Sequence, residues 1–551
     1  MTSILFRCDA SLSIGSGHVM RCRTLARELQ RRGAEIVFLC RRQPGDLIGL
    51  LEQEFLVLAL PEQALANCEG LEGRELYGAW LGCSQAHDAA QCLDALAEAR
   101  IGSADWLVVD HYGLDACWEE QLLVGLGGSA PPKLLVIDDL ADRSHQADLL
   151  LDQNFFGEST EQRYQGLVPL QCRQLLGPHY ALLGPEYAQL HPLVPVRTEL
   201  RRVLVFFGGV DPANLTGRAL EALMDPALAH LAVDVVLGRQ SPHGQAVEEL
   251  VARRLHTTLH GPLPSLAGLV ARADLAIGAG GATTWERACL VLPSLVVAIA
   301  ANQLPFAQAL DQAGHLVLMG NGATVSVEQI RAALLARIAE TFKEATCCTL
   351  TDGWGAPRLA IVMLGAQGPI SLRPAIAADE ALLLRWANDP QVRANSFSPK
   401  PIAPADHHHW FQAGLANPNR LLLIAKATDG CPIGQIRFDR QPSSTEGGAR
   451  QATVDLSLDR CARGHGLAFE LVQLGLRAME QRWGQTTDAV AEALSSNTAS
   501  NACFARAGFT QEAVSAVPPP PSQALNRWRW RPAASPCSAM AAAGSTPPCQ
   551  S

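Results

Sequence analysis

The sequence predicts an α/β protein with two doubly wound, parallel-sheet domains, followed by a smaller domain that has a mixed sheet. The first observation is that short apolar runs alternate with helical stretches through roughly the first 365 residues. Such runs, with helices between them, are typical of parallel strands that helices cover on both faces. The second observation is that this alternation stops near 366–372, where a different pattern begins.

The predicted strands of the parallel part are apolar runs bounded by turn residues. They cover residues 3–8, 34–40, 105–110, 133–139, 148–154, 201–209, 232–238, 273–281 and 293–300. A proline-rich break, "LHPLVPVRTEL" (190–200), is followed by a new strand. We therefore expect two Rossmann-like domains, over 1–195 and 196–366.

The last third of the chain predicts an α+β domain over 369–531. Its expected elements are an antiparallel hairpin over 421–440 with turn residues Asp429 and Gly430, a strand over 452–459, and a helix over 463–484. The tail, 532–551, is small and polar, and we expect it to be disordered.

Composition and charge exclude several classes of partner. The net charge is -10, which argues against general nucleic-acid binding because that requires a basic surface. No window of 18 uncharged apolar residues predicts a membrane span. The N-terminal segment lacks the basic start and apolar stretch of a signal peptide, so we expect a cytoplasmic protein.

The 16 cysteines have no metal-ligand spacing, and several, such as Cys40 and Cys289, lie inside apolar runs. We therefore expect buried free thiols and no metal site. The adjacent pair Cys347 and Cys348 has no redox signature of its own.

The segment "SIGSGH" (13–18) joins the first predicted strand to a helix. It half resembles the dinucleotide fingerprint G-x-G-x-x-G, but Met20 occupies the third glycine position. Gly15 and Gly17 therefore form either a plain tight turn or a ligand loop. His18 stands at the carboxyl edge of a parallel sheet, where such sheets bind ligands; a purely structural histidine is the alternative.

A second glycine-rich loop lies in "IGAGGATTWERACLVLPSLVVAIAANQ" (277–303), after a strand and before a helix. Backbone amides there could hold a pyrophosphate. Glu286 could accept hydrogen bonds from ribose hydroxyls, or it could be an exposed carboxylate near a helix start. The candidate contacts of this loop are Gly280, Gly281, Thr283 and Glu286.

Six segments together carry a resemblance to a known family. They are "RCDASLSIGSGHVMRCRTLA", "VVDHYGLDACWE", "VIDDLADRSHQADLLLDQN", "GPHYALL", "FGGVDPANLT" and the 277–303 loop. In this order, over about residues 3 to 365, they resemble the UDP-sugar hydrolases of pseudaminic acid biosynthesis, which are relatives of the GT-B glycosyltransferases. One departure is Gly184, where the resemblance leads us to expect an arginine.

The resemblance implies a GT-B-like pair of domains with a UDP-sugar between them. The implied substrate is UDP-2,4-diacetamido-2,4,6-trideoxy-β-L-altropyranose. Water would attack its anomeric carbon with inversion and release UDP and the free sugar, with His18 as the general base. Asp9 would orient His18, or it would only form a turn. Further substrate contacts are expected from Gly15 and Gly17, which let the backbone approach the sugar, and from His111, Tyr112, Asn302 and Gln303.

The segment "RGHGLAFELV" (463–472) fits R-x-x-G-x-A between a strand and a helix, a loop that directs amides at a pyrophosphate. It occurs with "LRPA" and Asp379, "WANDPQVRANSF", "HHHWF", "PIGQIRFD" and "NTASNACFARAGF". Over about 369 to 531 this array resembles the GCN5-related N-acetyltransferases (GNAT), and specifically those that acetylate the 4-amino group of the UDP-amino-sugar of the same pathway. The implied acetyl-CoA contacts are Arg463, Gly464, Gly466, Ala468 and Asn497.

Three further residues or runs bear on this second activity. Many of these acetyltransferases have a tyrosine as general acid where this chain has Phe504, which cannot donate a proton. Glu492 is a candidate base for the incoming amine. The run His407–His409 is expected to be a solvated helix start and not a metal site, because consecutive side chains point in different directions.

We therefore expect a bifunctional enzyme whose acetyltransferase product is the hydrolase substrate. The expected partners are UDP-amino-sugars and acetyl-CoA, with contacts to enzymes of the pathway and none to nucleic acid or membrane. The alternatives are a GT-B glycosyltransferase, in which an acceptor hydroxyl replaces water, and a protein with an inactive acetyltransferase half, such as a sugar-nucleotide sensor.

Overall fold

The computed structural model describes residues 2–63, 70–127, 131–339, 350–441, 450–484, 487–512 and 524–532. The pair Cys347 and Cys348, and the predicted tail from 533 onward, lie outside the described residues. The chain divides into two compact units, Met1–Ala360 and Ile361–Ser551.

The first sheet of the N-terminal unit has seven parallel strands in the order β3-β2-β1-β4-β5-β6-β7. They are β1 (Ser3–Cys8), β2 (Glu35–Arg41), β3 (Leu56–Leu60), β4 (Trp106–Asp110), β5 (Lys133–Ile137), β6 (Leu149–Asp152) and β7 (Arg173–Leu176). The connecting helices are α1 (Gly17–Arg31), α2 (Ile48–Leu51), α3 (Gly73–Leu81), α4 (Gln85–Glu98) and α5 (Ala116–Gly125). The order of winding reverses between β1 and β4.

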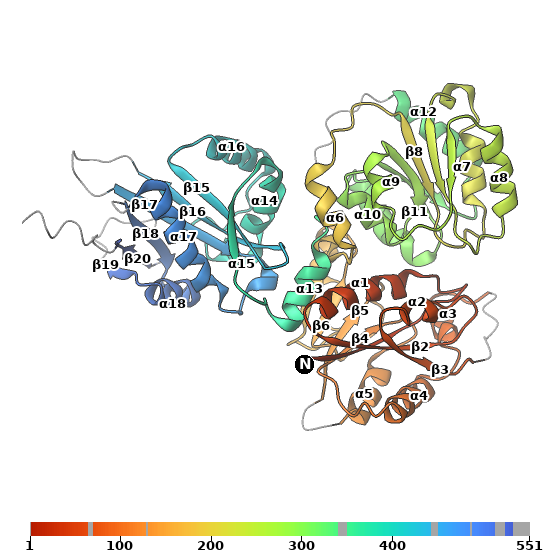
Figure 1. Cartoon of the computed structure of the whole chain (residues 1–551), viewed down its shortest axis with the longest axis horizontal. Helices are drawn as coiled ribbons and strands as arrows, with labels where there is room; N and C mark the ends of the chain where they lie inside the picture. Colours follow the sequence, from red (N-terminus) through yellow and green to blue (C-terminus); the bar gives the residue numbers. More distant parts are fainter. Residues whose placement is uncertain are drawn as a thin grey trace, which may run out of the picture. The chain divides into compact units, whose positions relative to one another are not determined.

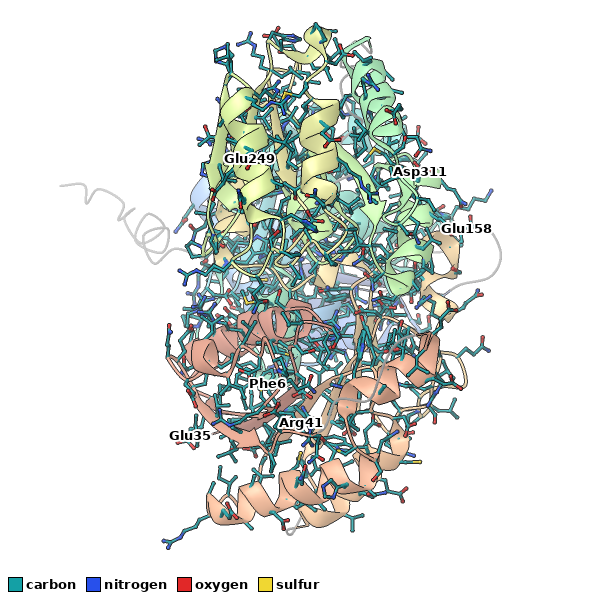
Figure 2. All side chains as sticks on the ribbon, turned by 90° about the vertical axis from the view of Figure 1, so that its right-hand side faces the viewer. Phe6, Glu35, Arg41, Glu158, Glu249 and Asp311 are labelled. Atoms are coloured by element: carbon teal, nitrogen blue, oxygen red, sulfur yellow. The ribbon has the colours of Figure 1, made fainter. Side chains whose placement is uncertain are left out.

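Helices cover both faces of this sheet, with α1 on one face and α4 and α5 on the other (Figure 1). Leu5 of β1 packs with Trp118 of α5 and with residues of α4, while its neighbour Phe6 stacks on Phe38. Burial on both faces is why β1 is apolar almost throughout, as the sequence predicts. Phe6 and Arg41 lie within this sheet region, and Glu249 lies on α8 of the second sheet (Figure 2).

The second sheet has six parallel strands in the order β10-β9-β8-β11-β12-β13. They are β8 (Arg202–Phe206), β9 (Ala232–Val236), β10 (Thr257–His260), β11 (Leu275–Ala279), β12 (Ser294–Ala298) and β13 (Val317–Asn321). The helices of this part are α6 (Pro185–Leu190), α7 (Leu215–Ala222), α8 (Gly244–Arg253), α9 (Ala267–Arg272), α10 (Thr283–Cys289), α11 (Leu304–Gln312), α12 (Val327–Ala339) and α13 (Gly355–Leu364). Successive residues of β8 enter different cores: Val203 and Val205 pack on one face and Leu204 on the other.

The C-terminal unit has a mixed seven-stranded sheet, in the order β14-β15-β16-β17-β18-β20-β19. Its strands are β14 (Ser371–Pro374), β15 (Arg420–Lys426), β16 (Pro432–Arg440), β17 (Arg450–Leu458), β18 (Thr487–Leu494), β19 (Thr510–Glu512) and β20 (Leu525–Trp530). Its helices are α14 (Glu380–Asn388), α15 (Pro390–Ala394), α16 (Pro404–Leu415), α17 (Leu467–Trp483) and α18 (Thr498–Arg506). The pair β17–β18 is parallel and the other pairs are antiparallel.

These observations confirm the predicted fold class: two parallel sheets with helices between the strands, followed by a mixed α+β unit. The predicted hairpin is β15–β16, with Gly430 in the left-handed region at its turn. Four strands of the two parallel sheets escaped prediction, namely β3, β7, β10 and β13. Each lies at or beside a sheet edge, and β10 ("TTLH") and β13 are only partly buried, so their sequences lack continuous apolar runs. Among the described helices, none is long and apolar enough to cross a membrane.

Candidate active sites

The first candidate site lies where the winding of the first sheet reverses, between β1 and β4. His18 is in the first turn of α1, which follows β1, and Asp110 is the last residue of β4. His18 Nδ1 lies 2.5 Å from Asp110 Oδ1. Asp110 is fully buried and His18 is 6% exposed. In doubly wound sheets, ligands bind beside such a reversal, at the carboxyl ends of the strands.

The contact with Asp110 assigns roles to the two nitrogens of the His18 ring. A carboxylate at Nδ1 stabilises the tautomer in which Nδ1 carries the proton and Nε2 is an acceptor. It also stabilises the imidazolium that forms when Nε2 takes a proton. The pair is therefore arranged for general-base chemistry at Nε2.

Arg21, one turn further along α1, holds Asp110 from the other side. Its Nε and Nη2 donate to the two oxygens of Asp110, each at 2.6 Å, and its Nη1 donates to Asp139 at 2.7 Å. Burial alone would raise the pKa of Asp110, but the neighbouring Arg21 and His18 hold that pKa well below its ordinary value. Asp110 is thus an anion, as the orientation of His18 requires.

The prediction that Asp9 orients His18 is wrong. Asp9 Oδ1 instead accepts hydrogen bonds from Arg7 Nη1 at 2.6 Å and from the Arg41 backbone N–H at 2.7 Å. The reason is strand alternation: Asp9 follows Arg7 to the face that α4 and α5 cover, whereas His18 is on α1, which covers the opposite face. Sequence reasoning missed Asp110, although it singled out the two residues that follow it.

Those two residues, His111 and Tyr112, lie in different environments. The Tyr112 ring contacts the His18 ring edge-on, with centroids 4.5 Å apart. Its hydroxyl donates to Asp139 and accepts a 3.2 Å hydrogen bond from Asn302 Nδ2, which follows β12 of the second sheet. The structure therefore brings His18, Tyr112 and Asn302 together. His111 faces Asp9 instead, with 3.5 Å between its Nε2 and Asp9 Oδ2.

The burial of His111 predicts a pH effect on stability. Burial, partly opposed by Asp9, lowers its pKa from 6.5 to about 4. Between these pH values the unfolded chain binds a proton that the folded chain does not, so stability falls as pH falls from 6.5 towards 4. The difference corresponds to about 3 kcal/mol for a fully buried group.

In urea unfolding between pH 4.5 and 7.5, His111→Asn, which keeps an acceptor for the Gly113 N–H, is expected to flatten the dependence of stability on pH. The same change at the exposed His87 is the control, and equal slopes for wild type and His111→Asn would contradict the assignment.

Only one of the two glycines before His18 needs to be glycine for its backbone. Gly15 has a φ of 81°, in the left-handed region, and its N–H donates to the Ser11 carbonyl at 2.8 Å. Gly17 begins α1, and a Cβ there would meet no atom within 4 Å. Gly17 therefore has open space beside it, and its role in a ligand loop remains a prediction.

In the second sheet, the loop after β11 lies against the segment after β12. A Cβ on Gly280 would lie 3.4 Å from Gln303 Oε1, and one on Gly281 would lie 3.5 Å from Gln303 Nε2. Gln303 Oε1 accepts from the Ile299 N–H at 3.0 Å, which fixes the side chain against the glycines. The structure thus groups Gly280, Gly281 and Gln303 beside the reversal point between β8 and β11.

Two other predicted residues of this loop lie on α10. Thr283 Oγ1 accepts a 3.3 Å hydrogen bond from Arg287. Glu286 is partly buried, and burial raises its pKa, an effect that the neighbouring Tyr187 and Arg287 oppose in part. At Gly184, where an arginine was expected, a Cβ would lie 2.5 Å from Glu186 Oε2, so the Glu186 carboxylate takes up the space of a longer side chain.

The second candidate site lies in the C-terminal unit, at the start of α17. Gly464 and Gly466 have φ values of 83° and 74°, so the loop before α17 requires glycine at both positions. Gly466 is the residue before the first turn of this 17-residue helix, and Ala468 is within that turn. Free N–H groups at such a helix start can bind a pyrophosphate.

The side chain of Arg463 does not point into this loop. Its Nη1 donates to Asp389 and to Gln391, each at 2.9 Å, and its Nε donates to the Leu458 carbonyl at 3.0 Å. The predicted pyrophosphate contact concerns the backbone amides of this loop, from Arg463 to Ala468, and it remains a prediction. Arg463 instead ties the end of β17 to the start of α15. Asn497 caps α18, accepting from the Ser500 N–H at 3.1 Å, and its contact with the coenzyme remains a prediction.

A feature that sequence reasoning missed is the divergence of β17 and β18. Their parallel pairing ends at Val454 and Ala491, but β17 continues to Leu458 and β18 to Leu494. Over these extensions the two strands no longer pair with each other, and the carbonyls of Leu458 and Leu494 accept hydrogen bonds from the side chains of Arg463 and Asn501. Backbone groups that lose a neighbouring strand need hydrogen bonds, and an extended ligand can supply them.

The remaining predicted residues of this unit are placed as follows. Glu492 is exposed and lies 3.8 Å from Arg527 Nη1 across β18 and β20. Phe504 is buried and packs against Phe509, so it is a core residue. The prediction of a solvated histidine run is wrong for His407, which is buried, and holds for His408 and His409, which are exposed. Within the described ranges, no group of three or more His, Cys, Asp or Glu residues could hold a metal ion.

Known proteins are similar to both parts of the chain. Residues 370–510 match the family described as "Acetyltransferase (GNAT) domain", so this part of the chain is a GNAT domain. The N-terminal unit has two parallel sheets with helices between the strands, the architecture of two Rossmann-like domains. A solved structure titled "Crystal structure of acinetobacter baumannii MurG" is 15% identical and covers 66% of this chain and 99% of its own, with a TM-score of 0.42.

Named relatives confirm the resemblance that the sequence motifs carry. The chain is 24% identical over 323 residues to "Spore coat polysaccharide biosynthesis protein SpsG" of Bacillus subtilis, a match over 58% of this chain and 85% of the relative. It is 26% identical over 213 residues to "UDP-2,4-diacetamido-2,4,6-trideoxy-beta-L-altropyranose hydrolase" of Campylobacter jejuni. That second match covers 39% of this chain and 62% of the relative, which is less than two thirds of its length.

A third relative is similar over most of the chain. "Uncharacterized protein MJ1062" of Methanocaldococcus jannaschii is 21% identical over 447 residues, a match over 78% of this chain and 82% of the relative. The N-terminal unit ends at Ala360, so a match of this length includes residues of both units. The similarity therefore extends across the junction between the two units.

Proposed function

We propose that the N-terminal unit hydrolyses a UDP-sugar at its anomeric carbon, and that the GNAT domain acetylates an amino group of a UDP-amino-sugar. The observation that carries the first half is the pair formed by His18 and Asp110 at the reversal point of the first sheet. The substrate class follows the printed name of the Campylobacter jejuni relative, a UDP-2,4-diacetamido-2,4,6-trideoxy-β-L-altropyranose hydrolase.

In the proposed reaction, His18 Nε2 accepts a proton from a water molecule as that water attacks the anomeric carbon. Asp110 stabilises the imidazolium, and Arg21 keeps Asp110 ionised. The bond from the anomeric carbon to the diphosphate oxygen breaks, and UDP leaves with the bonding electrons. Attack from the side opposite UDP gives the sugar with inverted anomeric configuration.

Tyr112 and Asn302 support the same site from two different sheets. Their hydrogen bond joins the end of β4 to the segment after β12, next to the His18 ring. A hydroxyl and an amide at this point offer both donors and acceptors to a sugar. We assign the loop of Gly280 and Gly281 to the UDP end, because backbone amides stabilise developing negative charge on a leaving phosphate.

Glu286 is the residue whose replacement tests the UDP end. In the proposal its carboxylate accepts hydrogen bonds from the ribose hydroxyls. Hydrogen bonds to a charged group are worth about 1.5–3 kcal/mol, so Glu286→Gln is expected to weaken UDP binding by roughly 10- to 100-fold. Calorimetric titration with UDP measures this change.

The matched control for Glu286→Gln is Glu249→Gln, on the exposed face of α8 (Figure 2). This control is expected to bind UDP as the wild type does. If Glu286→Gln binds UDP with unchanged affinity, the ribose contact is not made by Glu286.

For the GNAT domain, acetyl-CoA is the acetyl donor that the family implies, and the chain's residues fit it. The two left-handed glycines before α17 open the loop for a pyrophosphate, and in the proposal the extended pantetheine arm lies where β17 and β18 no longer pair. When the two halves act in sequence, the acetylated product of the GNAT domain is the substrate of the hydrolase.

Acceptor-free release of UDP separates hydrolysis from the glycosyltransferase alternative. The whole chain is incubated with UDP-2,4-diacetamido-2,4,6-trideoxy-β-L-altropyranose alone, and UDP and free sugar are quantified. Hydrolysis gives equal amounts of both products. Release of UDP only after a sugar acceptor is added would favour a GT-B glycosyltransferase, and loss of acetyl-CoA turnover with any UDP-amino-sugar would favour an inactive acetyltransferase half.

A further inference from the structure

The GNAT domain contains a cavity that the predicted acetyl-CoA contacts do not line. Its volume is about 420 Å³, and its walls come from α14, α15 and α16 on one side and from β16 and β17 on the other. This size is in the range of small-molecule sites. None of the predicted residues Arg463, Gly464, Gly466, Ala468, Asn497 or Glu492 is among its lining residues.

The sheet side of the cavity is polar because of strand register. Gln435 of β16 lies opposite Ser457 of β17, and Arg437 lies opposite Asp455. All four side chains line the cavity. The alternate residue Ile436 points to the other face, where it meets α17 at Gly475. Ile436 therefore packs on α17, and the polar residues Gln435, Arg437, Asp455 and Ser457 line the cavity.

Two buried polar side chains of the cavity, one on the helix side and one on the sheet side, have polar atoms without hydrogen-bond partners among the described residues. His407 is 3% exposed, and neither of its ring nitrogens has a partner among the described residues. Gln435 is 7% exposed; its Nε2 donates to Asp455 at 3.0 Å, but its Oε1 has no partner in the same part of the chain. Buried polar groups are normally hydrogen-bonded, so unpaired buried atoms beside a cavity point to a polar ligand.

The His407 ring is fixed in place by its neighbours. It is nearly parallel to the Phe411 ring, with centroids 5.9 Å apart, and lies 5.4 Å from the Trp410 ring. Burial lowers the pKa of His407, an effect that Glu380 on α14 opposes and His408 reinforces. The other charged groups of the cavity are Arg393, Asp406, Arg437 and Asp455. His407 is therefore a neutral imidazole at neutral pH, able to accept a proton.

The cavity also reaches the strand segment beside the divergence of β17 and β18. Asp455, Leu456 and Ser457 line the cavity, and they belong to the part of β17 that no longer pairs with β18. A donor held between the diverging strands on one edge of this segment would thus be next to a ligand in the cavity. Direct acetyl transfer requires the acetyl donor and the acceptor amine to lie next to each other.

We propose that His407, which lines this cavity, is the base that takes the proton from the acceptor amine of the GNAT domain. This inference rests on the proposed acetyltransferase function. The amine nitrogen attacks the thioester carbonyl of acetyl-CoA, a C–N bond forms and the C–S bond breaks. The amine proton passes to His407, coenzyme A leaves as a thiolate that takes a proton from water, and His407 returns its proton to solvent.

The charges of the cavity select the class of amine. Two carboxylates, Asp406 and Asp455, are balanced by two guanidinium groups, Arg393 and Arg437, so the wall has no excess negative charge to hold a polyamine. Apolar side chains of the lining, Leu383, Ala387 and Val392, supply a surface for the C–H groups of a sugar ring. An amino-sugar with one amine, carried on an anionic nucleotide, fits this wall better than a polycation does.

The test compares His407→Phe with His408→Phe in the full chain. Phenylalanine keeps the aromatic packing of His407 and removes its nitrogens, and His408 is the exposed neighbour on the same helix. The probes are UDP-2-acetamido-4-amino-2,4,6-trideoxy-β-L-altropyranose, spermidine and coenzyme A. The readouts are acetyl transfer, coenzyme A affinity by calorimetry, and the NMR shifts of the His407 ring as the amino-sugar is added.

His407→Phe is expected to lower the rate of acetyl transfer by roughly 10²-fold or more, the usual contribution of a general base. Its affinity for coenzyme A is expected to stay unchanged, and His408→Phe is expected to behave as wild type. In the wild type, the amino-sugar shifts the His407 ring signals and spermidine does not.

Three results would overturn the inference. The first is a wild-type rate of acetyl transfer in His407→Phe. The second is loss of acetyl transfer in Glu492→Gln while His407→Phe stays active, and the third is that no amine shifts the NMR signals of the His407 ring. In these cases acetyl transfer to the amino-sugar by the wild type still leaves the proposed function standing. The converse outcome is also possible to distinguish. If a sugar amine shifts the His407 signals of the wild type, but the enzyme acetylates a sugar other than the UDP-amino-sugar probe, the proposed substrate is overturned and the role of His407 stands.

Discussion

Replacement of His18 by glutamine is expected to abolish most of the UDP-sugar hydrolysis while leaving UDP binding intact. Glutamine keeps a polar side chain of similar length but has no group that can take a proton from water near neutral pH. Loss of a general base costs typically ~10²–10⁴-fold in rate. The rate of UDP release is measured under saturating substrate, and UDP affinity is measured by calorimetry.

Asp110→Asn tests whether the pair, and not His18 alone, is the functional unit. At 2.5 Å from Asp110 Oδ1, the protonated Nδ1 of His18 needs an acceptor. Asparagine can place an N–H there instead, which stabilises the tautomer with the proton on Nε2, and that tautomer cannot accept a proton at Nε2. Its rate is expected to fall within the same range as that of His18→Gln, and the double variant is expected to be no slower than the worse single one. His87→Gln, at an exposed position of α4, is the control. Full hydrolysis by His18→Gln would contradict the mechanism.

The second large effect is on stability, at Asp88 of α4. Asp88 accepts hydrogen bonds from Arg7 at 2.7 Å, from Arg41 at 2.5 Å and from Trp118 Nε1 at 2.9 Å, and all four side chains are fully buried. Burial alone would raise the pKa of Asp88, but Arg7 and Arg41 hold it well below its ordinary value. Arg41 lies inside the first sheet region (Figure 2).

Asp88→Ala removes one carboxylate and leaves two arginines buried with too few acceptors. Breaking a buried ion pair by removing one partner costs about 3–5 kcal/mol. Because the chain has two units, a single unfolding midpoint is a poor measure, and hydrogen exchange of β1, β2 and β4 reports the loss locally. Exchange in β15 and β16 of the other unit is expected to stay unchanged.

Asp94→Ala is the matched control for Asp88→Ala, because Asp94 is exposed on the same helix. Exposed substitutions of this kind change stability by less than about 0.5 kcal/mol. Equal protection of β1 in Asp88→Ala and Asp94→Ala would show that the buried network does not stabilise the sheet.

The interior strands of both parallel sheets were predictable, because burial on two faces demands continuous apolar runs. β1 (Ser3–Cys8) coincides with the predicted run 3–8. Edge strands such as β10 and β13 were not predictable in this way, since one side of an edge strand is open and its residues need not be apolar.

In the candidate sites, too, some features were predictable from the sequence and others were not. Motifs within a single loop, such as those around His18 and Gly466, are local patterns, and the sequence places them correctly before helices. Partnerships across strands depend on which face a side chain takes. The exchange of Asp9 for Asp110 is one example, and the burial of His407, which the run of three histidines conceals, is another.

The most direct test of the central claim is hydrolysis in ¹⁸O-labelled water without any acceptor, followed by NMR of both products. The whole chain is mixed with UDP-2,4-diacetamido-2,4,6-trideoxy-β-L-altropyranose, with His18→Gln in parallel. Attack of water at the anomeric carbon predicts UDP without ¹⁸O and a free sugar that first appears in the inverted anomeric form, both at rates that collapse in His18→Gln. Incorporation of ¹⁸O into the UDP phosphate, or no UDP release in the absence of an acceptor, would contradict it.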